Sequence, residues 1–332
     1  MLILSGDIGA TKARFAFMET IENGIQICKQ HNPITLSSPK FNNLQHLITE
    51  SITILGKTPD AISLGVAGPV QQQYCEVTNL PWHIDAHALK RALNIPIIYI
   101  INDLEAIAYG ILALNAGDIC TLNQGTPDAQ GNLAIIAAGT GLGEAGVCRQ
   151  NGGFYPFPSE GGHTDFAPSN IKEQELLKFL AKRYGHVSWE RVVSGLGIPN
   201  ILEFLCQYYN NTILPNSVQE CMDQGIGASC IANAATTNIC PLCEETMEMF
   251  VSMYGREAGN CALKLMATGG VYLAGGIAPK VLPRLQSSTF LTAFFAKGRM
   301  QSIMQNIPVY VILNDQIALF GAALAVLKHF DE

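Results

Sequence analysis

Two patterns of apolar residues alternate along the chain. Short apolar runs bounded by turn residues predict buried strands at residues 61–66, 97–101, 271–274 and 309–312. Apolar residues spaced by three or four positions predict helices around residues 104–114, 176–180 and 319–327. Strands that alternate with helices indicate an α/β fold.

One combination of strand, glycine turn and strand occurs twice, at residues 2–17 and 133–148. At 332 residues and 48% hydrophobic composition, the chain exceeds the roughly 250–300 residues at which one core stops growing. We therefore expect two domains, each with a hairpin followed by an α/β unit. A cleft between such domains is where ligands usually bind.

Charge and composition exclude several classes of protein. The chain has 20 Lys and Arg against 27 Asp and Glu, a net charge of −7, so no basic field is present to attract a nucleic acid. The first residues predict a strand, without the apolar region of a signal peptide or membrane span.

The ten cysteines are scattered through apolar runs, which indicates reduced thiols in the cytoplasm. Cys240 and Cys243 form an isolated pair, for which we expect no metal.

Three glycine segments are candidate nucleotide-binding elements. Residues 6–11 join two predicted strands, so they cannot form a Walker loop, but their backbone N–H groups, Thr11 and Asp7 suit a phosphate and water-bound Mg²⁺. Taken alone, the segment is more typical of a plain hairpin. A second turn at 139–143 offers matching donors, so the two could clamp one polyphosphate. Gly275-Gly276 could seat adenine, or mark a close helix–strand crossing.

Polar residues at two further places suit a sugar and a general base. Asn102-Asp103 follows a predicted strand at its carboxyl end, where open α/β sheets bind ligands. Asp103 could act as a base, or simply cap the next helix. Residues 159–166 are rich in donors and acceptors for sugar hydroxyls. His163 or Glu190 alone would more often be structural.

Taken together, these segments resemble the bacterial-type glucokinases of the hexokinase, sugar-kinase and actin-like superfamily, nearly end to end. The resemblance rests on residues 7–11, 78–82, 101–103, 139–141, 160–166, 185–195 and 274–277. It implies an actin-like, ribonuclease H-like fold with a cleft between a small domain (1–104 plus 314–332) and a large domain (105–313). The implied reaction is ATP-dependent phosphorylation of D-glucose to glucose 6-phosphate in the cytoplasm, by a homodimer.

The resemblance also assigns roles to single residues. Asp103 is implied as the general base. Glucose is implied to bind Asn79, Asn102, Asp103, Glu160, His163 and Glu190. ATP is implied to bind Gly6, Asp7, Ile8, Gly9, Ala10, Thr11, Gly139, Thr140, Gly141, Gly275 and Gly276. Asp7 is implied to hold Mg²⁺ through water.

Two residues depart from the family pattern. Ala10 stands where a second glycine is usual, which puts ATP affinity in question. Lys12 is typical of the related repressor/ORF/kinase family, whose cysteine-rich zinc motif is absent after His163.

The alternative functions are a kinase for another hexose or an amino sugar, a sugar-sensing regulator without turnover, and an actin-like or chaperone ATPase. The presence of Asp103, a candidate base, argues against a regulator without turnover. The polar loop at residues 160–166 would have no purpose in an actin-like or chaperone ATPase, which argues against that alternative.

Overall fold

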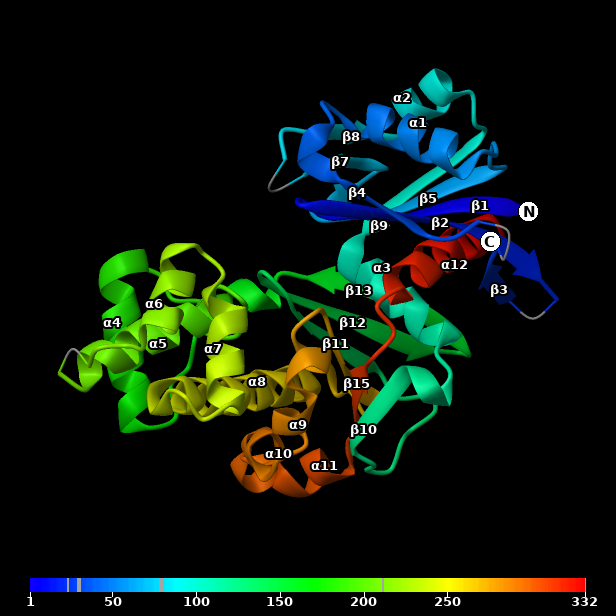
Figure 1. Ribbon diagram of the computed structural model, residues 1–332. Coiled ribbons are helices and arrows are strands. Elements are labelled where there is room, and N and C mark those ends of the chain that lie inside the picture. The colour runs from blue at the N-terminus through cyan, green and yellow to red at the C-terminus, as the bar shows by residue number, and fades with distance from the viewer. Residues whose placement is uncertain (23, 29–30, 78–79, 211, 332) are drawn as a thin grey trace. The chain divides into compact units, whose positions relative to one another are not determined.

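The computed structural model describes residues 1–22, 24–28, 31–77, 80–210 and 212–331. The chain divides into two compact units (Figure 1). Unit 1 comprises Met1–Asp118 and Asn314–Glu332, and unit 2 comprises Ile119–Leu313. The division after residue 104 suggested by the family resemblance stays a prediction.

Unit 1 contains a mixed sheet in the order β3-β2-β1-β5-β9, with β4 also paired to β2, and a small sheet of β6, β7 and β8. Its strands are β1 (Leu2–Ile8), β2 (Lys12–Ile21), β3 (Gly24–Ile27), β4 (Ile34–Ser37), β5 (Ala61–Val66), β6 (Val70–Gln71), β7 (Tyr74–Glu76), β8 (His83–Asp85) and β9 (Ile97–Asn102). Its helices are α1 (Leu44–Leu55), α2 (Ala86–Leu93), α3 (Asp103–Gly110) and α12 (Ile317–Asp331), with short 3-10 turns η1 (Ser38–Lys40), η2 (Ile111–Ala113) and η3 (Ala116–Asp118).

Helix α12 packs on the sheet of unit 1 through small and apolar residues. Leu319, Ala323 and Val326 join Ile3 and Met18 of the sheet in one buried cluster. The sheet also bonds the helix directly, because the hydroxyls of Ser5 and Ser63 donate to the carbonyls of Leu319 (2.6 Å) and Ala322 (2.5 Å). A side chain at Gly321 would overlap the backbone of Ala106 in α3. The last helix of the chain is therefore part of the core of unit 1.

Unit 2 contains a six-stranded sheet in the order β10-β15-β14-β11-β12-β13. Its strands are β10 (Ile119–Asn123), β11 (Leu133–Ala138), β12 (Leu142–Gln150), β13 (Gly153–Ser159), β14 (Gly270–Ala274) and β15 (Val309–Ile312). Its helices are α4 (Ile171–Tyr184), α5 (Gly197–Tyr208), α6 (Asn216–Asp223), α7 (Gly227–Thr236), α8 (Pro241–Leu265), α9 (Leu282–Leu285), α10 (Ser288–Phe295) and α11 (Gln301–Asn306), with 3-10 turns η4 (Gly161–His163), η5 (Trp189–Arg191), η6 (Ala278–Val281) and η7 (Gly298–Met300).

The predicted repeat is present as two similar sheets. In unit 1 the hairpin β1–β2 adjoins the parallel strands β5 and β9. In unit 2 the hairpin β11–β12 adjoins the parallel strands β14 and β15. The four predicted strands match β5, β9, β14 and β15, and the α/β prediction is confirmed.

The cysteines differ in part from the expectation of reduced thiols. Cys240 and Cys243 are buried at the start of α8, and burial together with the neighbouring Cys240 raises the pKa of Cys243. Cys221 and Cys230 instead form a disulfide between α6 and α7. The prediction is wrong for this pair, because the turn between the two helices brings the Cα atoms to 6.3 Å.

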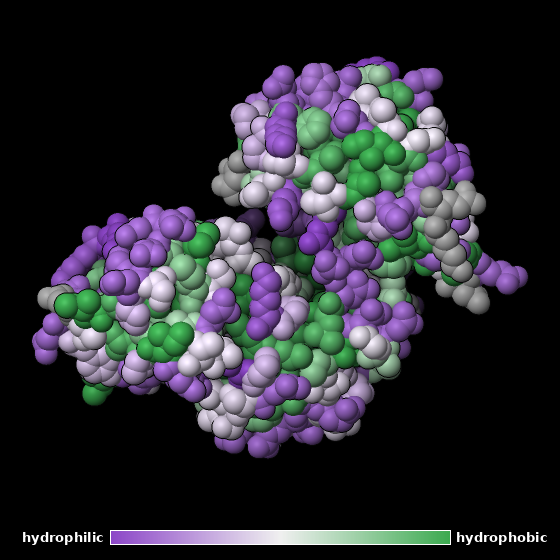
Figure 2. Space-filling model, viewed as in Figure 1, coloured by the Kyte–Doolittle hydropathy of each residue, from purple (hydrophilic) through white to green (hydrophobic). Residues whose placement is uncertain are grey.

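The surface has a mixed character. Figure 2 shows mainly hydrophilic residues on the visible face, with separate apolar patches. Among the described residues, every helix is either too short or too polar to cross a lipid bilayer.

Candidate functional site

The first glycine turn, residues 9–11, closes the β1–β2 hairpin of unit 1. The N–H of Gly9 donates to the carbonyl of Lys12 at 3.0 Å, and the hydroxyl of Ser38 donates to the carbonyl of Gly9 at 2.7 Å. Ala10 does not have the positive φ that favours glycine. The alanine therefore fits the turn without backbone strain.

The other predicted residues of this segment lie in strand β1. Ile8 is buried in the core, and a side chain at Gly6 would overlap Leu64. Asp7 lies opposite Arg14 in the hairpin. Burial raises the pKa of Asp7, and the charge of Arg14 partly offsets that rise. The guanidinium of Arg14 bonds to Asp315 instead, and the Asp7 carboxylate has no hydrogen bond within the described ranges.

Asn102, and not Asp103, caps helix α3. The side-chain oxygen of Asn102 accepts from the N–H groups of Leu104 (2.9 Å) and Glu105 (3.4 Å), and its amide donates to the carbonyl of Gly68 (3.1 Å). Asp103 is the first helical residue, where the positive end of the helix dipole favours a carboxylate. Asn102 is therefore the N-cap of α3, and Oδ1 of Asp103 also accepts from the N–H of Leu104 at 3.0 Å.

The second glycine turn, residues 139–141, closes the β11–β12 hairpin of unit 2. The N–H of Gly139 donates to the carbonyl of Gly141 at 2.9 Å, and its own carbonyl accepts from the N–H of Gly195 at 2.8 Å. Glu190 contacts the residue that follows the turn, because its Oε2 accepts a hydrogen bond from the N–H of Leu142 at 3.0 Å. A side chain at Gly141 would overlap that carboxylate.

The predicted sugar segment folds into the turn η4 beside η5. The N–H of Trp189 donates to the carbonyl of Thr164 at 3.0 Å, which joins the two turns. The side chains of Glu160 and His163 are 76% and 60% exposed and lie 3.8 Å apart as an ion pair. The structure thus brings Glu160, His163 and Glu190 onto two linked turns of unit 2. Glu190 lies in the first turn of η5, as the structural alternative predicts, but Ser188 makes no side-chain cap there.

A cavity of about 550 Å³ in unit 2 opens beside the second glycine turn. Gly139, Thr140 and Gly195 line one part of it, and Lys280 and Arg191 add positive charge. Its apolar lining includes Leu196 and Ile226, whose side chains are unusually exposed for their type. This combination suits a flat apolar ring joined to an anionic group.

Sequence reasoning missed most of this cavity. Gly275 and Gly276 come just before Ile277, which lines the cavity. Gly275 has a φ of +82°, a backbone conformation that only glycine adopts readily. Most of the remaining wall comes from α5 and α7, with residues of α4, α6 and η6. A larger hollow of about 670 Å³ between α4 and α5 contains none of the predicted residues. Asn79 lies outside the described residues.

Comparison with known proteins gives one consistent match. The model of the family "Glucokinase" matches residues 4–329. A glucokinase of Nostoc punctiforme is 40% identical over 98% of this chain and 99% of its own. The crystal structure of a glucokinase from an Antarctic psychrotroph has a TM-score of 0.84 at 31% identity, covering 98% of this chain and 99% of that one.

A more distant structure shares the fold alone. It is a ROK family glucokinase from Streptomyces griseus, in complex with glucose and AMPPNP. Its TM-score is 0.65 at 18% identity, and the match covers 99% of this chain and all of that chain. The expected sugar-kinase and actin-like fold is confirmed by these structural matches.

Proposed function

Since the chain belongs to the glucokinase family, we propose that it transfers the γ-phosphoryl group of ATP to the 6-hydroxyl of D-glucose. The products are glucose 6-phosphate and ADP. The observation that carries the proposal is the position of the second glycine turn, which lines the cavity of about 550 Å³ in unit 2.

This cavity suits ATP in both shape and charge. The exposed apolar side chains of Leu196 and Ile226 would pack against the adenine ring, and Lys280 lies in the same wall. Gly139 and Thr140 would receive the phosphates, because no side chain beyond a threonine blocks their approach. The Streptomyces griseus neighbour, whose structure contains glucose and AMPPNP, supports this choice of ligands.

Asp103 is proposed as the general base. Its carboxylate would accept the proton of the 6-hydroxyl while that oxygen forms a bond to the γ-phosphorus and the bond to the departing ADP breaks. The position of Asp103 at the start of α3 favours the ionised form that a base requires. Asn102 is the N-cap of α3, so the helix keeps its cap when the carboxylate of Asp103 is changed.

The glucose hydroxyls are proposed to bind Glu160, His163 and Glu190 of unit 2, and Asn102, Asp103 and Asn79 of unit 1. Asn102 already uses its oxygen twice and one amide hydrogen, so it has one amide hydrogen left for a sugar. Glu190 would serve two purposes, since it also holds Leu142 next to the phosphate turn.

The first glycine turn is proposed to complete the phosphate site. Gly9, Ala10 and Thr11 offer backbone and hydroxyl donors, and Asp7 would hold Mg²⁺ through water, for which a carboxylate without a protein partner is suited. Bound Mg²⁺ would neutralise charge on the phosphates. A cytoplasmic location and a homodimer stay predictions.

A coupled assay tests the proposal. The purified chain with ATP and Mg²⁺ is offered glucose, mannose, fructose, galactose and N-acetylglucosamine in turn, and ADP release is recorded. We expect glucose to have the highest kcat/KM. A higher value for another sugar would replace glucose as the substrate, and no turnover with any of them would favour a sensor or a different ATPase.

A further inference from the structure

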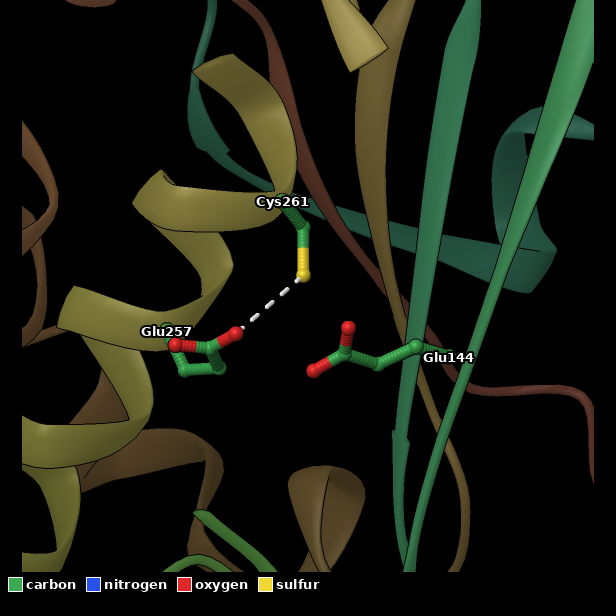
Figure 3. A group of neighbouring side chains, drawn as sticks. All are labelled: Glu144, Glu257 and Cys261. Carbon is green, nitrogen blue, oxygen red and sulfur yellow. Dashed lines mark hydrogen bonds between the residues drawn. The ribbon is translucent and has the colours of Figure 1, made fainter. Parts of the chain in front are cut away.

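A buried group of three side chains in unit 2 has no part in the proposed reaction. Glu144 extends from β12, and Glu257 and Cys261 lie one helical turn apart on α8. Figure 3 shows the three side chains pointing toward one another from the strand and the helix. One donor atom from each lies within 4.8 Å of the others. All three are closed off from water, with exposed fractions of 5%, 0% and 3%.

One oxygen in this group lacks a partner. Oε1 of Glu144 is buried and makes no hydrogen bond within the part of the chain that the structure describes. Within the group, the thiol of Cys261 lies 3.9 Å from Oε1 of Glu257, whose Oε2 accepts from the amide of Asn260 at 2.7 Å. Burying a carboxylate oxygen without a partner is costly. The arrangement therefore points to a ligand that compensates for it.

Two lysines lie near the group. Nζ of Lys264 is 3.5 Å from Oε1 of Glu257, with a side chain 54% exposed, and the charge of Lys297 also acts on Glu257 and Cys261. Protons or a cation are required to balance these groups.

We propose that Glu144, Glu257 and Cys261 bind one zinc ion. Two carboxylates and one thiolate carry three negative charges. Zn²⁺ would neutralise two of them, and the lysines beside the group would offset the third. Thiolate favours zinc over Mg²⁺ or Ca²⁺, which prefer six or more oxygen ligands. Zinc takes four ligands, so three protein ligands would leave its fourth position to a water molecule, and the unpartnered oxygen of Glu144 would gain a partner.

The ion would support the turn that carries the proposed sugar ligands. Oε2 of Glu144 lies against Gly161, where any side chain would overlap it, and Gly161 follows Glu160 directly. A metal ion that joins β12 to α8 would therefore hold Glu144 in place against Gly161, the first residue of η4. Its role is structural, since none of the three ligands belongs to the proposed reacting groups.

Zinc binding is tested on the whole chain. The protein is stripped with a chelator, dialysed, and titrated with ZnCl₂ by calorimetry, while elemental analysis gives the metal content and a thermal melt gives Tm. We expect one zinc per chain and a higher Tm with zinc. Glu257→Gln and Cys261→Ala should each weaken zinc binding at least tenfold, as loss of one of three ligands requires.

Cys243→Ala is the matched control, because Cys243 is buried on the same helix but lies outside the group. It should bind zinc like the unaltered chain. Loss of zinc in Cys243→Ala, with normal binding in Cys261→Ala, would place the metal at Cys240 and Cys243 and overturn the proposal. Failure of the folded, metal-free chain to bind zinc at all would also overturn it, and would show that the two carboxyl groups share a proton instead.

Discussion

The two glycine turns have the same local form but are held in place differently. The turn at residues 9–11 is fixed by Ser38, which lies just after the neighbouring strand β4. The turn at residues 139–141 is fixed by Glu190 and by the backbone of Gly195. The first turn thus depends on a hydroxyl, and the second depends on a charged group from the segment that also carries the proposed sugar ligands.

This difference indicates a division of tasks. The carboxylate of Glu190 connects the second turn to the proposed sugar segment, whereas Ser38 supports the first turn alone. A change at Glu190 should therefore affect both substrates, and a change at Ser38 should affect ATP. Neither turn supplies a base, and the base proposed for proton transfer is Asp103.

The largest effect is expected for Asp103→Asn, which removes the base and leaves both turns intact. Loss of a general base lowers kcat about 10²–10⁴-fold, or roughly 3–5 kcal/mol of barrier. Because Asn102 caps α3, glucose binding and Tm should change little. Steady-state kinetics and a thermal melt measure these quantities.

Asn102→Ala is the control for the helix. Loss of the cap should cost about 1 kcal/mol of stability, which Asp103→Asn should not. If Asp103→Asn kept more than about a tenth of the wild-type kcat, outside the range for a lost base, Asp103 would not be the base.

Glu190→Ala should have the next largest effect. Loss of a hydrogen bond to a charged group costs about 1.5–3 kcal/mol, so the KM values for glucose and for ATP should both rise about 10- to 100-fold. Initial rates with each substrate varied in turn give both constants. Glu175→Ala is the control, since Glu175 is an acid on the outside of α4 that pairs with Lys178.

A rise in the glucose KM alone would show that Glu190 is a sugar ligand without influence on the second turn. The contrast between the two turns would then be lost, because the bond to Leu142 would have no effect on ATP.

Ser38→Ala should have a smaller effect, confined to ATP. One neutral hydrogen bond is worth about 0.5–1.5 kcal/mol, so the KM for ATP should rise about 2- to 10-fold with the glucose KM unchanged. Ser51→Ala provides the comparison, because Ser51 is also buried but bonds within α1. Equal effects of the two variants would mean that Ser38 stabilises unit 1 without positioning the turn.

Ala10→Gly should have the smallest effect. Ala10 already has a backbone conformation open to any residue, so the KM for ATP should stay within about twofold and stability should fall by at most about 1 kcal/mol from the added chain entropy. Steady-state kinetics give the KM for ATP, and a thermal melt gives the stability. A several-fold drop in the ATP KM would show that alanine does restrict the turn.

Sequence reasoning succeeded where local pattern determines structure. The strands β5, β9, β14 and β15 are short apolar runs, and the structure places them almost residue for residue. The two hairpins follow from glycine turns between such runs. Local pattern did not reveal β13, whose Pro156 and Pro158 are unusual in a strand and are tolerated because β13 is at the edge of its sheet.

Contacts between distant segments could not be read from the sequence. Glu257 and Cys261 stand four positions apart, which places them on one helix face, but nothing in the sequence connects them to Glu144. Likewise, Asn and Asp are equally good caps, so the adjacent pair at 102 and 103 did not reveal which residue caps α3. The disulfide between Cys221 and Cys230 depended on the turn between two helices that carry no motif.

The position of α12 has a consequence for how the chain folds during synthesis. Unit 2 is one continuous stretch, residues 119–313, so all of its strands and helices leave the ribosome in succession. Unit 1 is interrupted, because the helix whose carbonyls accept from Ser5 and Ser63 is made last. Domains generally fold as units while they emerge. The sheet of the first 118 residues therefore lacks the part of its cover that α12 provides until residues 317–331 have been made, and apolar residues such as Ile3 and Met18 are exposed to misassociation until then.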